Sequence, residues 1–175
     1  MVEHEKFMRR AIELAWVGLG RNSPNPLVGC VIVRDGEIVG EGSHLYEKIE
    51  HAETIALRHA EEKAKGATVY CTLEPCSHTG RTPPCADALI EAGVKRVVYG
   101  LKDPNMLVNG GGHEKLSDAG VDVIGGVLED DIREQNKFFV CVHEKNRPYI
   151  LSKWGMTADG KIATRIGSSK WISSP

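Results

Sequence analysis

The chain has 175 residues, enough for one domain of about 100–200 residues, and 41% of them are hydrophobic. Charged residues make up 26%, and a formal net charge of −2 excludes the strongly basic character that recruits nucleic acid. No apolar run approaches the roughly 18 residues of a membrane helix, and the N-terminus lacks a signal peptide's apolar core. These features predict a cytoplasmic protein with a small-molecule substrate and without nucleic-acid or membrane partners.

The first third of the chain predicts a helix over residues 3–19, a turn-rich loop and a β-hairpin. Apolar residues recur at helical spacing in the helix, and two glycines end it. The loop, residues 22–26, contains two prolines that fix its backbone, so it is either a binding wall or a simple connector. The hairpin strands, 27–33 and 37–41, are β-branched runs on either side of an Asp-Gly pair, the strongest short-range hairpin signal.

From residue 51 onward the pattern alternates between helices and strands. The expected helices cover 51–65, 83–92, 113–119 and 128–142, and the expected strands cover 67–73, 96–100 and 121–124. A hairpin followed by helix–strand pairs predicts an α/β fold with helices on both faces of a sheet. The five cysteines are an odd number, which favours metal binding or chemistry over disulfides.

Three of the predicted elements carry residues that suit a zinc ion. His51 opens a predicted helix, Cys76 follows a predicted strand, and Cys85 opens the next helix. One imidazole and two thiolates are a ligand set that zinc accepts, with a fourth position left open for water. Glu53 lies two residues past His51, where its carboxylate can take a proton from that water and return it to a leaving group.

The alternatives to an open catalytic zinc are a closed structural site and three unrelated residues. A closed site requires a fourth ligand, and the remaining cysteines, Cys30, Cys71 and Cys141, are scattered along the chain. Cys30 and Cys71 lie in apolar strands and are expected to be small core residues.

Polar residues near the metal motif allow two readings. His78 and Arg81 are either ordinary charges of a solvated loop or groups that hold an anionic part of the substrate, such as a phosphate. His44, seven residues before His51, is either a structural histidine or a site residue.

Zinc deaminases carry the signature H-x-E followed by P-C-x-x-C, and here the two cysteines are nine residues apart instead of three. His51-Ala-Glu53 with Pro75-Cys76-Ser-His-Thr-Gly-Arg-Thr-Pro-Pro-Cys85 resembles the deaminase domain of the bifunctional riboflavin-biosynthesis deaminase–reductases. The resemblance extends to Asn22-Ser-Pro-Asn-Pro26, to Asp103-Pro-Asn105 and to the tail from Asp159 to Trp171.

This resemblance implies a cytidine-deaminase-like three-layer α/β/α sandwich with a central mixed sheet over residues 1–146, and one zinc ion per chain. The implied reaction is the hydrolytic loss of an amino group from 2,5-diamino-6-ribosylamino-4(3H)-pyrimidinone 5′-phosphate. The positions expected to hold this phosphorylated aminopyrimidine are Asn25, His44, His78 and Arg81. The chain departs from the family pattern at Lys48-Ile49 and at Met106.

Residues 149–154 predict a strand. Residues 147–175 resemble the first strand and loop of the reductase domain, similar to dihydrofolate reductase, that follows the deaminase in this family. Gly155, Ser169 and Trp171 match positions that contact NADPH and substrate there. About 28 residues cannot bury a core of their own, so this tail is expected to be poorly ordered or to pack on a neighbouring surface. We therefore expect no reductase activity from this chain; a homo-oligomer and a separate reductase chain both stay open.

Three rival functions share part of the pattern. A nucleic-acid deaminase has the same zinc chemistry but favours the short cysteine spacing and a basic face, and neither is present. A non-catalytic zinc module needs neither Glu53 nor an open metal position. A deaminase of another nucleotide or nucleobase is the third alternative.

Overall fold

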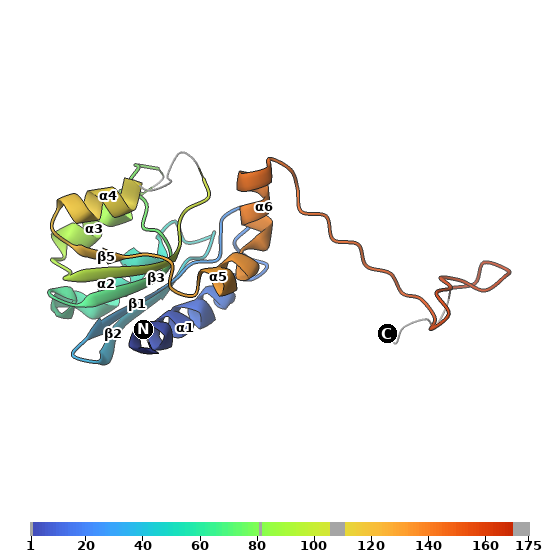
Figure 1. Cartoon of the computed structure of the whole chain (residues 1–175), viewed down its shortest axis with the longest axis horizontal. Helices are drawn as coiled ribbons and strands as arrows, with labels where there is room; N and C mark the ends of the chain where they lie inside the picture. The colour runs from blue at the N-terminus through green and yellow to red at the C-terminus, as the bar shows by residue number, and fades with distance from the viewer. Residues whose placement is uncertain (1, 81, 106–110, 170–175) are drawn as a thin grey trace.

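The computed structural model describes residues 2–80, 82–105 and 111–169. In chain order its elements are α1 (Val2–Ala15), the 3-10 turn η1 (Trp16–Gly18), β1 (Gly29–Arg34), β2 (Glu37–Ser43), α2 (Ala52–Ala60), the 3-10 turn η2 (Glu61–Ala64), β3 (Thr68–Leu73), α3 (Cys85–Glu91), β4 (Arg96–Leu101), α4 (Gly111–Asp118), β5 (Asp122–Ile124), α5 (Glu129–Gln135) and α6 (Lys137–Lys145) (Figure 1).

The strands form one mixed sheet in the order β2-β1-β3-β4-β5. Strand β1 is antiparallel to both of its neighbours, whereas β3, β4 and β5 run parallel to one another. Asp35 and Gly36 connect β1 to β2 with positive φ angles of 53° and 82°, as a type I′ hairpin turn requires. The Asp-Gly pair in the sequence therefore marks the turn correctly.

Helices cover both faces of this sheet, as predicted. Helices α2, α3 and α4 lie on one face, and α1 and α5 lie on the other (Figure 1). Glycines bring the layers close: a Cβ atom on Gly29 would lie 2.0 Å from the carbonyl oxygen of Ala11, and one on Gly42 would lie 2.1 Å from that of Ala52. The first turn of α2 can rest directly on the sheet because Gly42 has no side chain.

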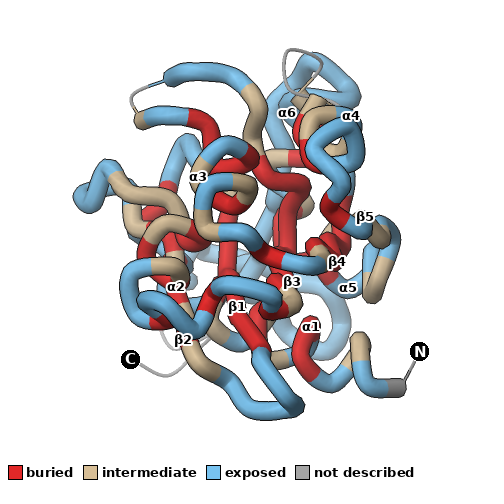
Figure 2. The backbone as a smooth tube through the Cα atoms, turned by 90° about the vertical axis from the view of Figure 1, so that its left-hand side faces the viewer, coloured by how far each residue is buried: buried red, intermediate tan, exposed pale blue. Residues whose placement is uncertain are grey.

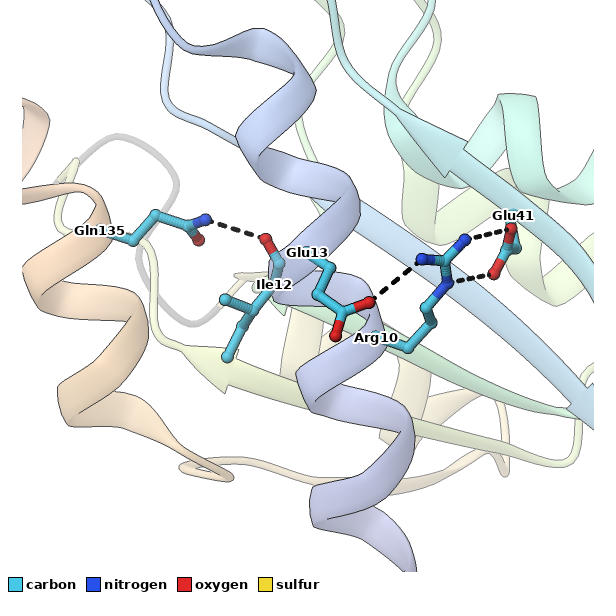
Figure 3. Close-up of polar contacts among 5 residues, drawn as sticks. All are labelled: Arg10, Ile12, Glu13, Glu41 and Gln135. Atoms are coloured by element: carbon cyan, nitrogen blue, oxygen red, sulfur yellow. Dashed lines mark hydrogen bonds and ion pairs between the residues drawn. The ribbon is translucent and has the colours of Figure 1, made fainter.

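Polar contacts fix α1 on both sides (Figure 3). The Arg10 guanidinium donates two hydrogen bonds to the Glu41 carboxylate of β2, at 2.7 and 3.1 Å, and one to Glu13 at 3.1 Å. On the other side, Gln135 of α5 donates from its Nε2 to the carbonyl of Ile12 at 2.9 Å. The ion pair is partly exposed and contributes about 0–1 kcal/mol, so its main effect is to orient α1 against the hairpin.

Buried residues concentrate along the central strands and the helix faces that cover them (Figure 2). The largest fully buried side chains come from both helix layers and the sheet, and include Met8, Ile32, Leu89, Leu101, Leu116 and Ile132. Within the described part of the chain, no helix combines the length and the apolar character needed to cross a membrane.

The observed helix bounds differ from the predicted ones in several places. The first ends at Ala15, and the one expected over 51–65 ends at Ala60; a 3-10 turn continues each of them. The helix expected over 128–142 is two helices, interrupted at Asn136. The Asn136 side chain accepts a hydrogen bond from the backbone N–H of Leu27 at 2.7 Å and donates to its carbonyl at 3.1 Å. This long-range contact favours a break that helical periodicity does not reveal.

The tail after α6 leads away from the body of the molecule (Figure 1). Residues 149–169 are exposed except for a half-buried Ala163, and the strand expected over 149–154 does not form. That expectation was wrong for the isolated chain because a strand needs a partner for its backbone groups. One packing contact is the Tyr149 ring edge-on to Phe138, with 4.9 Å between the ring centroids.

Candidate active site

The three predicted metal ligands come together where α2 and α3 begin. His51 immediately precedes α2, Cys85 is the first residue of α3, and Cys76 lies on the segment that follows β3. Their ligand atoms all lie within 4.8 Å of one another. The Nδ1 atom of His51 is 3.1 Å from the sulfur of Cys85 and 3.6 Å from the sulfur of Cys76.

These separations fit a tetrahedral zinc ion. With Zn–S bonds of about 2.3 Å and Zn–N bonds of about 2.0–2.1 Å, nitrogen and sulfur ligands lie about 3.6 Å apart. The His51–Cys76 distance of 3.6 Å matches this value, and the His51–Cys85 distance of 3.1 Å needs only a small adjustment. Three ligands leave a fourth position open. Within the residues that the structure describes, no other cluster of three or more His, Cys, Asp or Glu side chains could hold a metal.

Neighbouring groups orient two of the ligands. The backbone N–H of Cys85 donates to the sulfur of Cys76 at 3.3 Å, and the N–H of Ala86 donates to the Cys76 carbonyl at 3.1 Å. The first turn of α3 thus favours a negative sulfur on Cys76. On the far side of the imidazole, the Thr82 hydroxyl lies 3.4 Å from Nε2 of His51, which leaves Nδ1 to face the two sulfurs.

The ionisation of the two thiols is coupled. A hydrogen bond with Cys85, with a further contribution from His51, lowers the pKa of Cys76 and so favours its thiolate form. The hydrogen bond with that thiolate, together with burial, raises the pKa of Cys85. A divalent cation held by these residues would lower the pKa of Cys85 instead, since its charge would stabilise both thiolates.

Glu53 lies in the first turn of α2 and is only 4% exposed. It lines a cavity of about 220 Å³ that His51 and Cys76 also line. Burial raises the pKa of its carboxyl group. A carboxyl group whose pKa is raised toward neutrality can both accept and return a proton, which is the property that a general acid–base group needs.

Three of the predicted substrate residues line the same cavity: Asn25, His44 and His78. The Nδ2 group of Asn25 is 3.0 Å from Nε2 of His44, and Nδ1 of His44 is 2.9 Å from the carbonyl oxygen of Glu50. Burial lowers the pKa of His44, which favours the neutral ring. Nδ1 then donates to Glu50, and Nε2 accepts from Asn25.

The remaining predicted substrate and cofactor residues are partly outside the described part of the chain. Arg81 and Trp171 lie outside the described residues. Gly155 and Ser169 are exposed in the tail, and neither lines the cavity.

Residues 1–101 match the family model of the cytidine and deoxycytidylate deaminase zinc-binding region. The chain belongs to this deaminase family. The matched segment contains the three predicted metal ligands and Glu53.

Longer deaminases resemble nearly the whole chain. Riboflavin biosynthesis protein RibD of Actinobacillus pleuropneumoniae is 56% identical over 169 residues, which are 95% of this chain and 44% of that protein. RibD of Escherichia coli (strain K12) is 53% identical over 174 residues, 99% of this chain and 47% of that one. The chain thus spans about half the length of these curated relatives.

A solved structure from Thermotoga maritima agrees with both the fold and the sequence. It is described as a diaminohydroxyphosphoribosylaminopyrimidine deaminase/5-amino-6-(5-phosphoribosylamino)uracil reductase and is 50% identical, with a TM-score of 0.92. The match covers 98% of this chain and 50% of that one. The resemblance to riboflavin-biosynthesis deaminase–reductases and the cytidine-deaminase-like fold are therefore confirmed.

The deaminase cavity also has walls that the sequence alone did not reveal. Glu74, only 2% exposed, accepts hydrogen bonds from the backbone N–H groups of His113 at 3.0 Å and Asp103 at 3.4 Å. It thereby joins the loop that carries Cys76 to the segments around β4 and α4. Phe139 reaches the cavity from α6. Glu74 stands two residues before the predicted ligand Cys76, and this position could have identified it as a residue near the site. Nothing in the helical pattern of α6 marks Phe139 as a cavity residue.

Proposed function

We propose that this chain is a zinc-dependent hydrolytic deaminase of 2,5-diamino-6-ribosylamino-4(3H)-pyrimidinone 5′-phosphate in riboflavin biosynthesis. The observation that carries the proposal is the grouping of the ligand atoms of His51, Cys76 and Cys85, beside a cavity that His51, Cys76 and the buried Glu53 line. The names of the relatives support the substrate, because these proteins are about 50% identical to this chain over nearly all of it.

The site residues divide the chemistry among them. When bound by His51, Cys76 and Cys85, a zinc ion supplies the positive charge that lowers the pKa of a water molecule. Glu53 would take a proton from such a water and return it to the amino group, so that the group could leave as ammonia while the ring gains the oxygen of the water. Asn25 and His44 hold the ring so that the carbon bearing the amino group faces that water.

We propose that the phosphate lies toward His78 and Arg81. A smaller cavity of about 130 Å³ adjoins the ring cavity on this side and is lined by His44, His78 and Thr82, among others. An imidazole and a guanidinium are suitable partners for a phosphate dianion, and Arg81 can bind two of its oxygens at once.

We further propose that residues 1–146 form the deaminase domain and that residues 147–175 begin a reductase domain. The relatives are about twice as long as this chain, and the Thermotoga maritima protein is described as a reductase as well as a deaminase. NADPH binding and the reduction belong, in this proposal, to the part of the relatives that lies beyond this chain. A homo-oligomer, or a second chain that carries the reductase, is consistent with this division.

Ammonia release from the purified 175-residue chain tests the proposal. The chelated protein should be inactive, and one equivalent of zinc should restore turnover of the phosphorylated aminopyrimidine. The dephosphorylated substrate should have a higher KM because it lacks the proposed contacts with His78 and Arg81. Deoxycytidylate as an equally good substrate would favour a deaminase of another nucleotide, and zinc binding without any turnover would favour the non-catalytic zinc module.

A further inference from the structure

Asn22 joins two segments that carry predicted substrate residues. Its side chain is 2% exposed, and every polar atom of its carboxamide is used. Nδ2 donates to the carbonyl of Pro26 at 3.1 Å and to the carbonyl of His44 at 2.8 Å, while Oδ1 accepts from the backbone N–H of Tyr46 at 3.2 Å. One side chain therefore ties the loop before β1 to the loop after β2.

The chemistry of this contact requires an asparagine. Two carbonyls and one N–H converge on the side chain, so the matching group must have two donors and one acceptor in one plane. Aspartate has the same shape but no donor, and it would place its oxygens against two carbonyls. The chain also leaves room for the amide: a Cβ atom on Gly18 would lie 2.6 Å from Nδ2 of Asn22.

Asn22 connects the loop before β1 to the loop after β2, beyond the point where the backbone hydrogen bonds of the two strands end. The last backbone contact near the open end of the hairpin runs from the N–H of His44 to the carbonyl of Val28, at 3.0 Å. Beyond this point the hydrogen bonds of the Asn22 side chain hold the loop before β1 and the loop after β2 together. The direct contact between the loops at the cavity is the 3.0 Å pair between Asn25 and His44, and both of these side chains line the cavity.

We propose that Asn22 is a positioning residue for substrate binding: its carboxamide holds the two loops in the register that forms the Asn25–His44 pair. The inference rests on the proposed function, because it assumes that this pair holds the pyrimidine ring. Asn22 itself does not line the cavity and acts through its neighbours. It is also distinct from the metal ligands, which lie on the other elements described above.

Substitution of Asn22 tests this role. Asn22→Asp keeps the shape and removes both donors, and Asn22→Ala removes the whole group. Because a displacement of about 1 Å in a positioned group can cost on the order of 100-fold in catalytic efficiency, we expect kcat/KM to fall about 10- to 100-fold, with a rise in KM as its main component because the displaced pair binds the ring. Zinc content should stay at one per chain, since no metal ligand is touched.

Thr72→Val is the matched control. Thr72 is also fully buried, its hydroxyl accepts a hydrogen bond from the backbone N–H of Gly29 at 3.1 Å, and neither residue lines the cavity. The control should lose stability without any rise in KM. A second readout needs no turnover: nitrogen NMR of His44 should show protonated Nδ1 and unprotonated Nε2 in the wild type, and shifted Nε2 signals in both Asn22 variants.

The outcomes separate the inference from the proposed function. Folded Asn22 variants with wild-type KM and unchanged His44 signals overturn the positioning role, and so does an equal rise in KM in Thr72→Val. A wild-type protein that releases no ammonia refutes the proposed function alone. In that case the His44 signals still decide whether Asn22 positions the pair.

Discussion

Replacement of Glu53 by glutamine separates proton transfer from metal binding. Glutamine keeps the shape of a side chain that is 4% exposed, and it removes the group that titrates. General acid–base groups contribute about 10²–10⁴-fold to the rate, which corresponds to about 3–5 kcal/mol in the activation free energy at 1.36 kcal/mol per tenfold. Because Glu53 is not one of the three ligands, the zinc content of the variant should remain one per chain.

The assay is ammonia release at saturating substrate, with zinc measured by elemental analysis on the same samples. Glu13→Gln is the control, because Glu13 is an exposed carboxylate of α1 that pairs with Arg10 at 3.1 Å and lies far along the chain from the site. The control should keep the wild-type rate. An active Glu53→Gln enzyme would remove Glu53 from the mechanism, and an inactive variant that has lost its zinc would show that Glu53 supports the metal instead.

Four further results follow from the structure. Cys85→Ser should lower zinc occupancy and the melting temperature together, because the lost ligand also stabilises the fold; full occupancy with normal melting would contradict the ligand assignment. Gly42→Ala places a Cβ atom 2.1 Å from the Ala52 carbonyl and should cost about 1–3 kcal/mol of unfolding free energy in urea titrations, and an unchanged value would show that α2 can move away freely. Burial raises the pKa of Tyr70 above its usual value of about 10, so its contribution to stability is complete below pH 10 and is lost as pH rises through the folded-state pKa; Tyr70→Phe should lack this alkaline loss, and identical pH profiles would refute it. Calorimetric titration of the 175-residue chain with NADPH should show no appreciable binding, because Gly155 and Ser169 lie in an exposed tail, and micromolar affinity would disprove this expectation.

The chemistry of the site was predictable because its signals are local. His51, Glu53, Cys76 and Cys85 each combine a side-chain type suited to zinc or proton transfer with a position at the start of a helix or just after a strand. The Asp-Gly turn was predictable for the same reason, since positive φ angles are a preference of the residues themselves. The family resemblance rests on these motifs and on the unusual cysteine spacing.

Only the tertiary structure decided how distant segments meet. The break at Asn136 exists because its side chain bonds to Leu27, 109 residues earlier in the chain. Asn22 likewise binds a carbonyl 22 residues away, and Phe139 reaches the cavity from a separate helix. Local propensity contains no information about such partners, because they depend on which surfaces pack together.

The tail is a case in which a local prediction failed for lack of a tertiary partner. Residues 149–154 predict a strand, but the described tail residues from 149 onward are exposed apart from Ala163 and form no strand. A strand is stable only when another strand satisfies its backbone N–H and C=O groups. The sequence thus predicted the hairpin and brought forward the residues proposed as zinc ligands and acid–base group, because side-chain chemistry and turn geometry belong to single residues. Strand pairing, helix interruption and the walls of the cavity were decided by packing, because each of them needs a partner from elsewhere in the fold.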